Sequence, residues 1–94
     1  MKHVICIKLT DNSDEHMNKV KELLLSMKGK VPMVEDIWVG TDFLHSERSF
    51  DIIMVAELTD RSVLDGYQND PYHAGVVKAY LSTAAKKIIA VDCE

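Results

Sequence analysis

The stretch His3–Leu9 reads HVICIKL, and the placement of its apolar residues decides the fold. A short run rich in β-branched and apolar residues is typical of a β-strand. Apolar residues fill both its odd and its even positions, so both faces of the strand are predicted to be covered. Phe50–Leu58, which reads FDIIMVAEL, has the same character, with one face interrupted only by Glu57. The chain therefore contains two strands that need cover on both sides.

Two further strands and the helices between them complete an alternating order. Glu35–Thr41 and Lys87–Cys93 are also predicted to be strands. After capping residues at 11–13, a helix with an apolar stripe is expected to run until Gly29. Thr59–Asp60 and Asp70–Pro71 are expected to begin two more helices. The order is β-α-β-β-α-β, which predicts a single α+β domain over residues 1–94, ferredoxin-like, with one four-stranded antiparallel sheet.

The helices of such a domain can cover only one face of the sheet, because right-handed crossovers place them on the same side. The other face would leave Val4, Cys6, Ile53 and Val55, or the residues of opposite parity, exposed. Each exposed side chain forfeits about 1.5–3 kcal/mol relative to burial, and bare patches of this kind are rare on soluble monomers. We therefore predict a homodimer that packs through its sheet faces and forms a dimeric α+β barrel.

Composition argues against several classes of function. Eleven Lys and Arg face fifteen Asp and Glu, for a net charge of −4, and no stretch concentrates the basic residues, so no nucleic-acid partner is expected. No apolar segment approaches the ~20 residues that span a bilayer, and the start lacks the features of a cleavable signal, which predicts a cytoplasmic protein without a membrane partner. Cys6 and Cys93 lie far apart and the four histidines are scattered, so neither a metal nor a cofactor is expected.

The segment Tyr67–His73, which reads YQNDPYH, is the candidate functional site. His73 precedes the apolar Val77 by four residues, and Tyr67 follows an apolar stripe at the same spacing, so both side chains are predicted to point between helices and sheet. If Asp70 caps the helix, the positive helix end keeps His73 neutral, although the carboxylate of Asp70 opposes this. A neutral imidazole can take a proton and a tyrosine hydroxyl can stabilise an enolate. The alternative is that both side chains merely fill the core.

His3 shares strand parity with Ile5, so both join this site if their face meets the helices. Otherwise His3 is a strand-end histidine half in water. A cavity of about 300 Å³ or more that reaches solvent near His73 and Tyr67 would favour a bound ligand. A dense interior, with His73 bonded to the backbone, would favour a structural role.

The sequence resembles the stress-responsive A/B barrel domain family, called Dabb. The similarity covers essentially the whole chain and is carried by KHVICIKL (2–9), KGKVP (28–32) and YQNDPYHAGVV (67–77). The most specific part is the pattern Tyr-x-x-(His/Asp)-Pro-x-His, in which this chain has Asp70 where the family often has His. The resemblance implies a dimeric α+β barrel, in agreement with the argument from the strands.

Most members of this family have no known activity, and some plant members resemble stress-associated structural proteins. One plant branch comprises polyketide cyclases, which close a poly-β-keto chain by aldol condensation with a Tyr/His pair and no cofactor. The resemblance implies that Tyr67 and His73 are this pair and that His3 is a pocket histidine. Another pocket histidine of the cyclases falls at Ile52 here, which weakens the match to that activity.

We therefore expect a homodimer that binds a small organic molecule between helices and sheet. The predicted catalytic residues are His73 and Tyr67, and the predicted ligand-binding residues are His3, Ile5, Ile52 and Val77. The enzymatic form of this hypothesis is a cofactor-free acid/base cyclase or isomerase of a keto compound. The alternative is a non-catalytic, stress-related structural or assembly protein.

Overall fold

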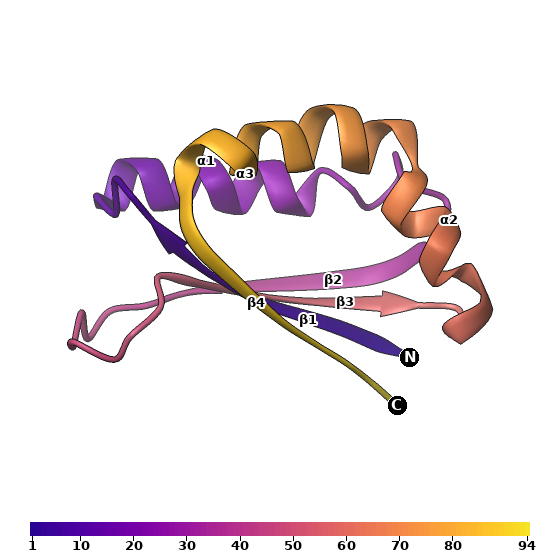
Figure 1. Ribbon diagram of the computed structural model, residues 1–94, viewed down its shortest axis with the longest axis horizontal. Coiled ribbons are helices and arrows are strands. Elements are labelled where there is room, and N and C mark those ends of the chain that lie inside the picture. Colours follow the sequence, from indigo (N-terminus) through magenta and orange to yellow (C-terminus); the bar gives the residue numbers. More distant parts are fainter.

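A computed structural model describes residues 1–94. The strands are β1 (Lys2–Leu9), β2 (Val34–Thr41), β3 (Ile52–Leu58) and β4 (Ala85–Cys93). The helices are α1 (Asp14–Leu25), the 3₁₀ turn η1 (Arg61–Val63), α2 (Leu64–Asn69), the π-helical η2 (His73–Lys78) and α3 (Ala79–Ala84). The strands form one sheet in the order β2-β3-β1-β4, antiparallel throughout, with α1 and α3 on the same side of it (Figure 1). The predicted ferredoxin-like α+β fold is confirmed.

The helix-covered side of the sheet, which we call the inner face, holds the core. On β1 the odd residues point there, and on β3 the even ones do, so that Ile7 lies opposite Ile52 and His3 opposite Ala56. Residues directly opposite each other on antiparallel strands point to the same face. Helix α1 lays Val20 and Leu24, both fully buried, against this face.

The other side of the sheet, which we call the outer face, has no helix over it (Figure 1). It carries two cross-strand rows of apolar side chains: Trp38, Val55, Val4 and Val91 in one, and Ile53, Cys6 and Ile89 with Gly40 in the other. Trp38 and Val91 are 60% and 62% exposed. An apolar sheet face is thus left bare within the chain, as predicted, and it is the face of Val4, Cys6, Ile53 and Val55.

The first helix begins where predicted but ends earlier. The hydroxyl of Ser13 accepts the backbone N–H of His16, which caps α1. The helix stops at Leu25 instead of Gly29, and a series of turns follows in which Gly29 has φ +94°, a conformation that favours glycine. These turns keep Met27 fully buried, although it lies outside the helix.

The helical segment after Asp70 differs from the predicted α-helix. Asp70 is the cap, since its Oδ1 accepts the backbone N–H groups of Tyr72 and His73. The residues that follow, His73–Lys78, form a π-helix before the chain returns to α geometry in α3. Short π-helical turns are rare and often occur at functional sites. The unusual turn therefore begins at the candidate catalytic histidine.

No helix of the protein has the length and apolar character that crossing a bilayer requires.

Candidate functional site

Four side chains from three parts of the chain meet on the inner face: His3, Tyr67, His73 and Asp92. We call them the His–Tyr cluster. His3 on β1 lies directly opposite Asp92 on β4. The two side chains are hydrogen-bonded, with His3 Nδ1 2.5 Å from Asp92 Oδ1. A carboxylate can only accept, so the proton of this hydrogen bond lies on His3 Nδ1.

Tyr67 lies at the centre of the cluster and is fully buried. Its ring meets the edge of the His3 ring, with centroids 5.2 Å apart and an angle of 62° between the planes. Its hydroxyl has only the thioether of Met27 as a partner, with an oxygen–sulfur distance of 3.9 Å. Burial, and to a lesser extent the charge of Asp92, raises the pKa of Tyr67 well above its ordinary value. The hydroxyl therefore keeps its proton and remains a nearly unused donor.

His73 also packs against Tyr67, with ring centroids 4.3 Å apart. Its Nδ1 is buried and has no hydrogen-bond partner. Burial lowers the pKa of His73. A contact with the backbone of Gln68, too poorly aligned to count as a hydrogen bond, opposes this most, and the carboxylate of Asp70 opposes it less. Lys78 and His3, when the latter is protonated, add to the lowering. The direction that the sequence left open is therefore downward, and the imidazole is neutral near pH 7.

The cluster thus pairs a neutral imidazole with a protonated phenol, and neither is fully used by the protein. Buried polar atoms without partners are uncommon, and each one calls for an explanation. In chemical terms, the imidazole can accept a proton and the phenol can donate a hydrogen bond to a developing oxyanion.

The three apolar residues predicted to bind a ligand lie on the same side of the sheet but not equally near the cluster. Ile5 is half-buried on β1, two residues from His3. Val77 is buried in η2, four residues after His73. Ile52 is buried too, but it is four residues along β3 from Ala56, the partner of His3. At about 3.3 Å per residue this is roughly 13 Å, so the structure does not bring Ile52 to the cluster.

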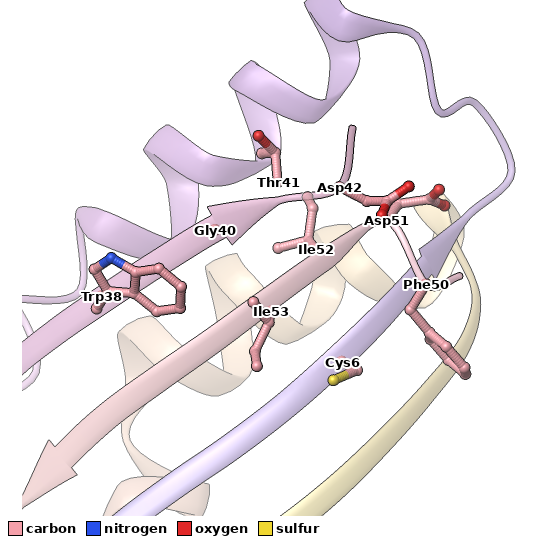
Figure 2. Close-up of a pocket in the computed structure, with 9 residues that line it drawn as sticks. All are labelled: Cys6, Trp38, Gly40, Thr41, Asp42, Phe50, Asp51, Ile52 and Ile53. Carbon is pink, nitrogen blue, oxygen red and sulfur yellow. The ribbon is translucent and has the colours of Figure 1, made fainter. Parts of the chain in front are cut away.

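The hollows on the protein surface are not lined by Tyr67 or His73. The largest, about 430 Å³, is on the outer face between Trp38, Ile53 and Cys6 (Figure 2). Another, of about 350 Å³, is lined by Asp92 together with Met1, Arg61 and Leu64. No hollow is lined by Tyr67 or His73. The interior around the pair is closed in the single chain, and the cluster adjoins solvent space at Asp92.

The sequence matches the family described as Stress responsive A/B Barrel Domain (Dabb) over residues 1–94. The chain belongs to the Dabb family. This match confirms the family resemblance that the β1 and Tyr67–His73 segments indicated. No curated protein matches the sequence of this Dabb chain.

Solved structures similar to this Dabb chain have the same fold. A dimeric protein of unknown function from Bacteroides fragilis is 23% identical, with a TM-score of 0.80 over 99% of this chain and 93% of that one. A Dabb family protein from Mesorhizobium loti is 16% identical, with a TM-score of 0.74 over 99% and 93%. A hydroxynitrile lyase from Passiflora edulis is 13% identical, with a TM-score of 0.78 over 96% and 87%. At such identities the likeness shows the ferredoxin-like fold alone.

Asp92 is the member of the cluster that sequence reasoning missed. It lies on the last strand at the same parity as Ile88, which is opposite Ile7 of the inner face. A strict count of alternation along β4 would have placed its carboxylate on that face. What the sequence did not give is the register of β4 against β1, which sets Asp92 opposite His3.

Proposed function

We propose that this Dabb protein is a homodimer that binds a small keto compound at the His–Tyr cluster. There it removes a proton from the carbon next to the carbonyl group of that compound. The observation that carries this proposal is the pair of unused polar groups in the interior, the partnerless Nδ1 of His73 and the Tyr67 hydroxyl that has only a sulfur acceptor. Burying such groups costs free energy unless something bonds to them. A carbonyl compound offers an acidic C–H bond to one group and an oxygen to the other.

In this mechanism the neutral imidazole of His73 removes a proton from the carbon next to the carbonyl. Electrons from the C–H bond move onto the carbonyl oxygen, and Tyr67 donates a hydrogen bond to the enolate oxygen that forms. His3 orients the ligand, and Asp92 holds the His3 ring in place through their 2.5 Å hydrogen bond. The enolate carbon then attacks a second carbonyl, whose oxygen takes the proton back from His73, which is cyclisation. Alternatively, the enolate takes that proton back at another carbon, which is isomerisation.

We propose that the ligand enters through the hollow beside Asp92. That hollow shares Asp92 with the cluster, and the Arg61–Glu94 ion pair lies at its rim. Because Tyr67 is fully buried, entry requires that α2 or the π-helix η2 shift slightly. The reaction is proposed to take place in the cytoplasm, where Cys6 and Cys93 remain thiols.

Hydrogen–deuterium exchange tests the proposed chemistry directly. Linear 3-oxo acids, 3,5-dioxo acids and methyl ketones are incubated in D2O with the purified protein, and loss of the protons next to the carbonyl is followed by NMR. We expect exchange above the buffer rate for at least one compound, with a loss of about a hundredfold in His73→Ala and a smaller loss in Tyr67→Phe. His45→Ala, in the exposed hairpin, is the matched control. If both cluster variants keep the full rate on an accepted compound, the assigned roles are wrong.

The dimer part of the proposal stands on the bare outer face and on the dimeric relatives of the same fold. Sedimentation velocity at micromolar concentration measures it. We expect a single species of twice the chain mass. A stable single subunit under these conditions would overturn the homodimer.

The second candidate function is a non-catalytic assembly role. The observation that favours it is the closed interior, with no hollow at Tyr67 or His73. Native mass spectrometry of freshly purified protein separates the two candidates. A retained small molecule whose mass is lost in His73→Ala supports ligand binding, whereas ligand-free higher assemblies support the structural role.

A further inference from the structure

The hollow beside Asp92 has one cationic side chain among its lining residues, that of Arg61. Leu64 and Met1 give it apolar walls, and Asp92 and Glu94 line it with carboxylates. Its volume of about 350 Å³ suits a small molecule, and sites for small molecules combine apolar walls with a few polar groups that set specificity. What this hollow can bind therefore depends on where its charges lie and on how far the chain already uses them.

Arg61, Leu64 and Tyr67 follow one another at intervals of three residues along η1 and α2. Side chains three residues apart lie on the same face of a 3₁₀ or α-helical turn. Arg61 is exposed, Leu64 is half-buried against the core, and Tyr67 is fully buried. One face of this helical segment thus leads from solvent to the His–Tyr cluster, with a charge at its outer end, an alkyl side chain in its middle and a phenol at its inner end.

The outer end of this segment is held in place by Asp60. Its carboxylate accepts the backbone N–H of Ser62 at 2.7 Å and caps the turn that carries Arg61. At a rise of about 1.5–2.0 Å per residue, Arg61 lies roughly 9–12 Å from Tyr67 along the helix axis. A ligand that contacts both residues is therefore elongated, with an apolar middle.

Arg61 is partly occupied within the chain, and the group that occupies it is a carboxylate. Its Nε donates to Oε1 of Glu94, whereas its two Nη groups have no partner. Both side chains are largely exposed, 81% for Arg61 and 58% for Glu94, and exposed ion pairs contribute little free energy. A guanidinium binds a carboxylate best through two parallel hydrogen bonds. A ligand carboxylate that engages Arg61 in this way can displace Glu94.

The remaining charge of the hollow sets the direction in which such a ligand lies. Asp92 belongs to the His–Tyr cluster, where its carboxylate is hydrogen-bonded to His3. A carboxylate at this inner end disfavours a second one, whereas Arg61 attracts one at the outer end. The neutral carbonyl end of the ligand therefore points inward, toward Tyr67 and His73.

We propose that the substrate is an elongated oxo acid. Its carboxylate binds Arg61, and its ketone, separated from the carboxylate by an apolar chain, reaches the His–Tyr cluster. This inference rests on the proposed function and adds the class of substrate. Arg61 selects that class, and the side chain of Glu94 takes the place of the substrate carboxylate in the free chain.

Binding of two matched compounds tests the role of Arg61. In 9-oxodecanoic acid the ketone and the carboxylate lie at opposite ends of an alkyl chain, and its methyl ester lacks only the charge. Isothermal titration calorimetry at low ionic strength measures both dissociation constants. We expect the acid to bind the unmodified protein about tenfold more tightly than the ester. Arg61→Gln should abolish this preference, and Arg61→Lys should keep part of it, because an ammonium group retains the charge without the planar fork.

Two further variants separate a specific site from a general effect of charge. Glu94→Gln removes the competing carboxylate, so it should tighten binding of the acid severalfold and leave binding of the ester unchanged. Lys28→Gln is the matched control for Arg61→Gln, because it also removes one positive charge from an exposed ion pair. Lys28 pairs with Asp36 and does not line the hollow, so this variant should keep the full preference for the acid.

The outcomes separate this inference from the proposed function. If the acid binds through Arg61 but its protons next to the ketone do not exchange in D2O, the proposed function fails and the carboxylate site stands. If exchange occurs but acid and ester bind equally, or Arg61→Gln keeps the preference, the carboxylate site is wrong and the proposed function stands. Failure of the acid to bind at all would also overturn the carboxylate site.

Discussion

The inner and outer faces of this sheet are built from the same strands and are similarly apolar at their centres, yet they meet different surroundings. Met54 on β3 points inward and is fully buried beneath the helices. Its neighbour Val55 points outward into a face where Trp38, on the next strand, is 60% exposed. Because side chains alternate along a strand, each strand contributes to two surfaces at once. One surface stabilises the chain, and the other is available for association.

The two ends of the sheet differ in a second way. At the hairpin end, the buried carboxylate of Asp51 is well satisfied, since it accepts the backbone N–H of Leu9 at 2.7 Å and the side-chain amide of Asn12 at 3.3 Å. At the other end, the Nδ1 of His73 is buried without a partner. A satisfied buried group indicates a structural role, whereas an unsatisfied one calls for a separate explanation.

The contrast between the faces predicts its largest effect in the core. Leu24→Ala removes a fully buried side chain, and we expect the unfolding free energy to fall by about 2–5 kcal/mol. Val91→Ala, on the outer face, should change subunit stability little. Urea denaturation at two protein concentrations measures both. Equal losses in the two variants would mean that the outer face contributes to folding as the inner face does.

The contrast between the two ends of the sheet predicts that replacing Asp51 lowers the free energy of unfolding. Asp51→Ala leaves the buried N–H of Leu9 without an acceptor, which costs about 1–3 kcal/mol. Asp51→Asn keeps an acceptor and should recover most of this loss. The midpoint of urea unfolding at fixed protein concentration is the measurement. An Asp51→Ala protein as stable as the unmodified one would show that the hydrogen bond contributes nothing.

Association should respond to Trp38. Trp38→Ala removes the largest exposed apolar side chain of the outer face. We expect the dissociation constant of the dimer to rise about tenfold, a loss of about 1.4 kcal/mol of association free energy. Phe43→Ala is the matched control, because Phe43 is 90% exposed but belongs to the hairpin instead of the outer face. Sedimentation equilibrium gives both constants. If Phe43→Ala weakens the dimer as much, association does not use the outer face.

Local patterns in the sequence were sufficient for the fold. Ser13 and Asp70 are caps as predicted, and the strand periodicities gave both apolar faces. They could not say which face the helices cover, because both were apolar. That choice depends on the packing of α1 against the whole sheet.

The site was predictable only in part, because its remaining features depend on distant residues. Tyr67 and His73 point inward, as helical spacing predicted. The partner of His3 depends on a cross-strand register between residues 89 positions apart, which no local pattern contains. The π-helical turn at His73–Lys78 depends on how that segment fits against α2 and α3, so helical periodicity predicted an α-helix instead.

The smallest expected effect is a pH dependence at His73. Its pKa is lower in the folded protein than in the unfolded chain, whose histidines titrate near about 6.5. Below that pH the unfolded chain binds the extra proton more readily, so the unfolding free energy falls as pH decreases and the contribution is fully present only above it. At most one proton is involved, so the slope stays below about 1.4 kcal/mol per pH unit. His73→Gln should flatten the stability curve between pH 7 and pH 5, whereas His45→Gln, in the exposed hairpin, should leave it unchanged. If His73→Gln keeps the full slope, His73 is not held neutral by burial, and it loses its place as the proposed base.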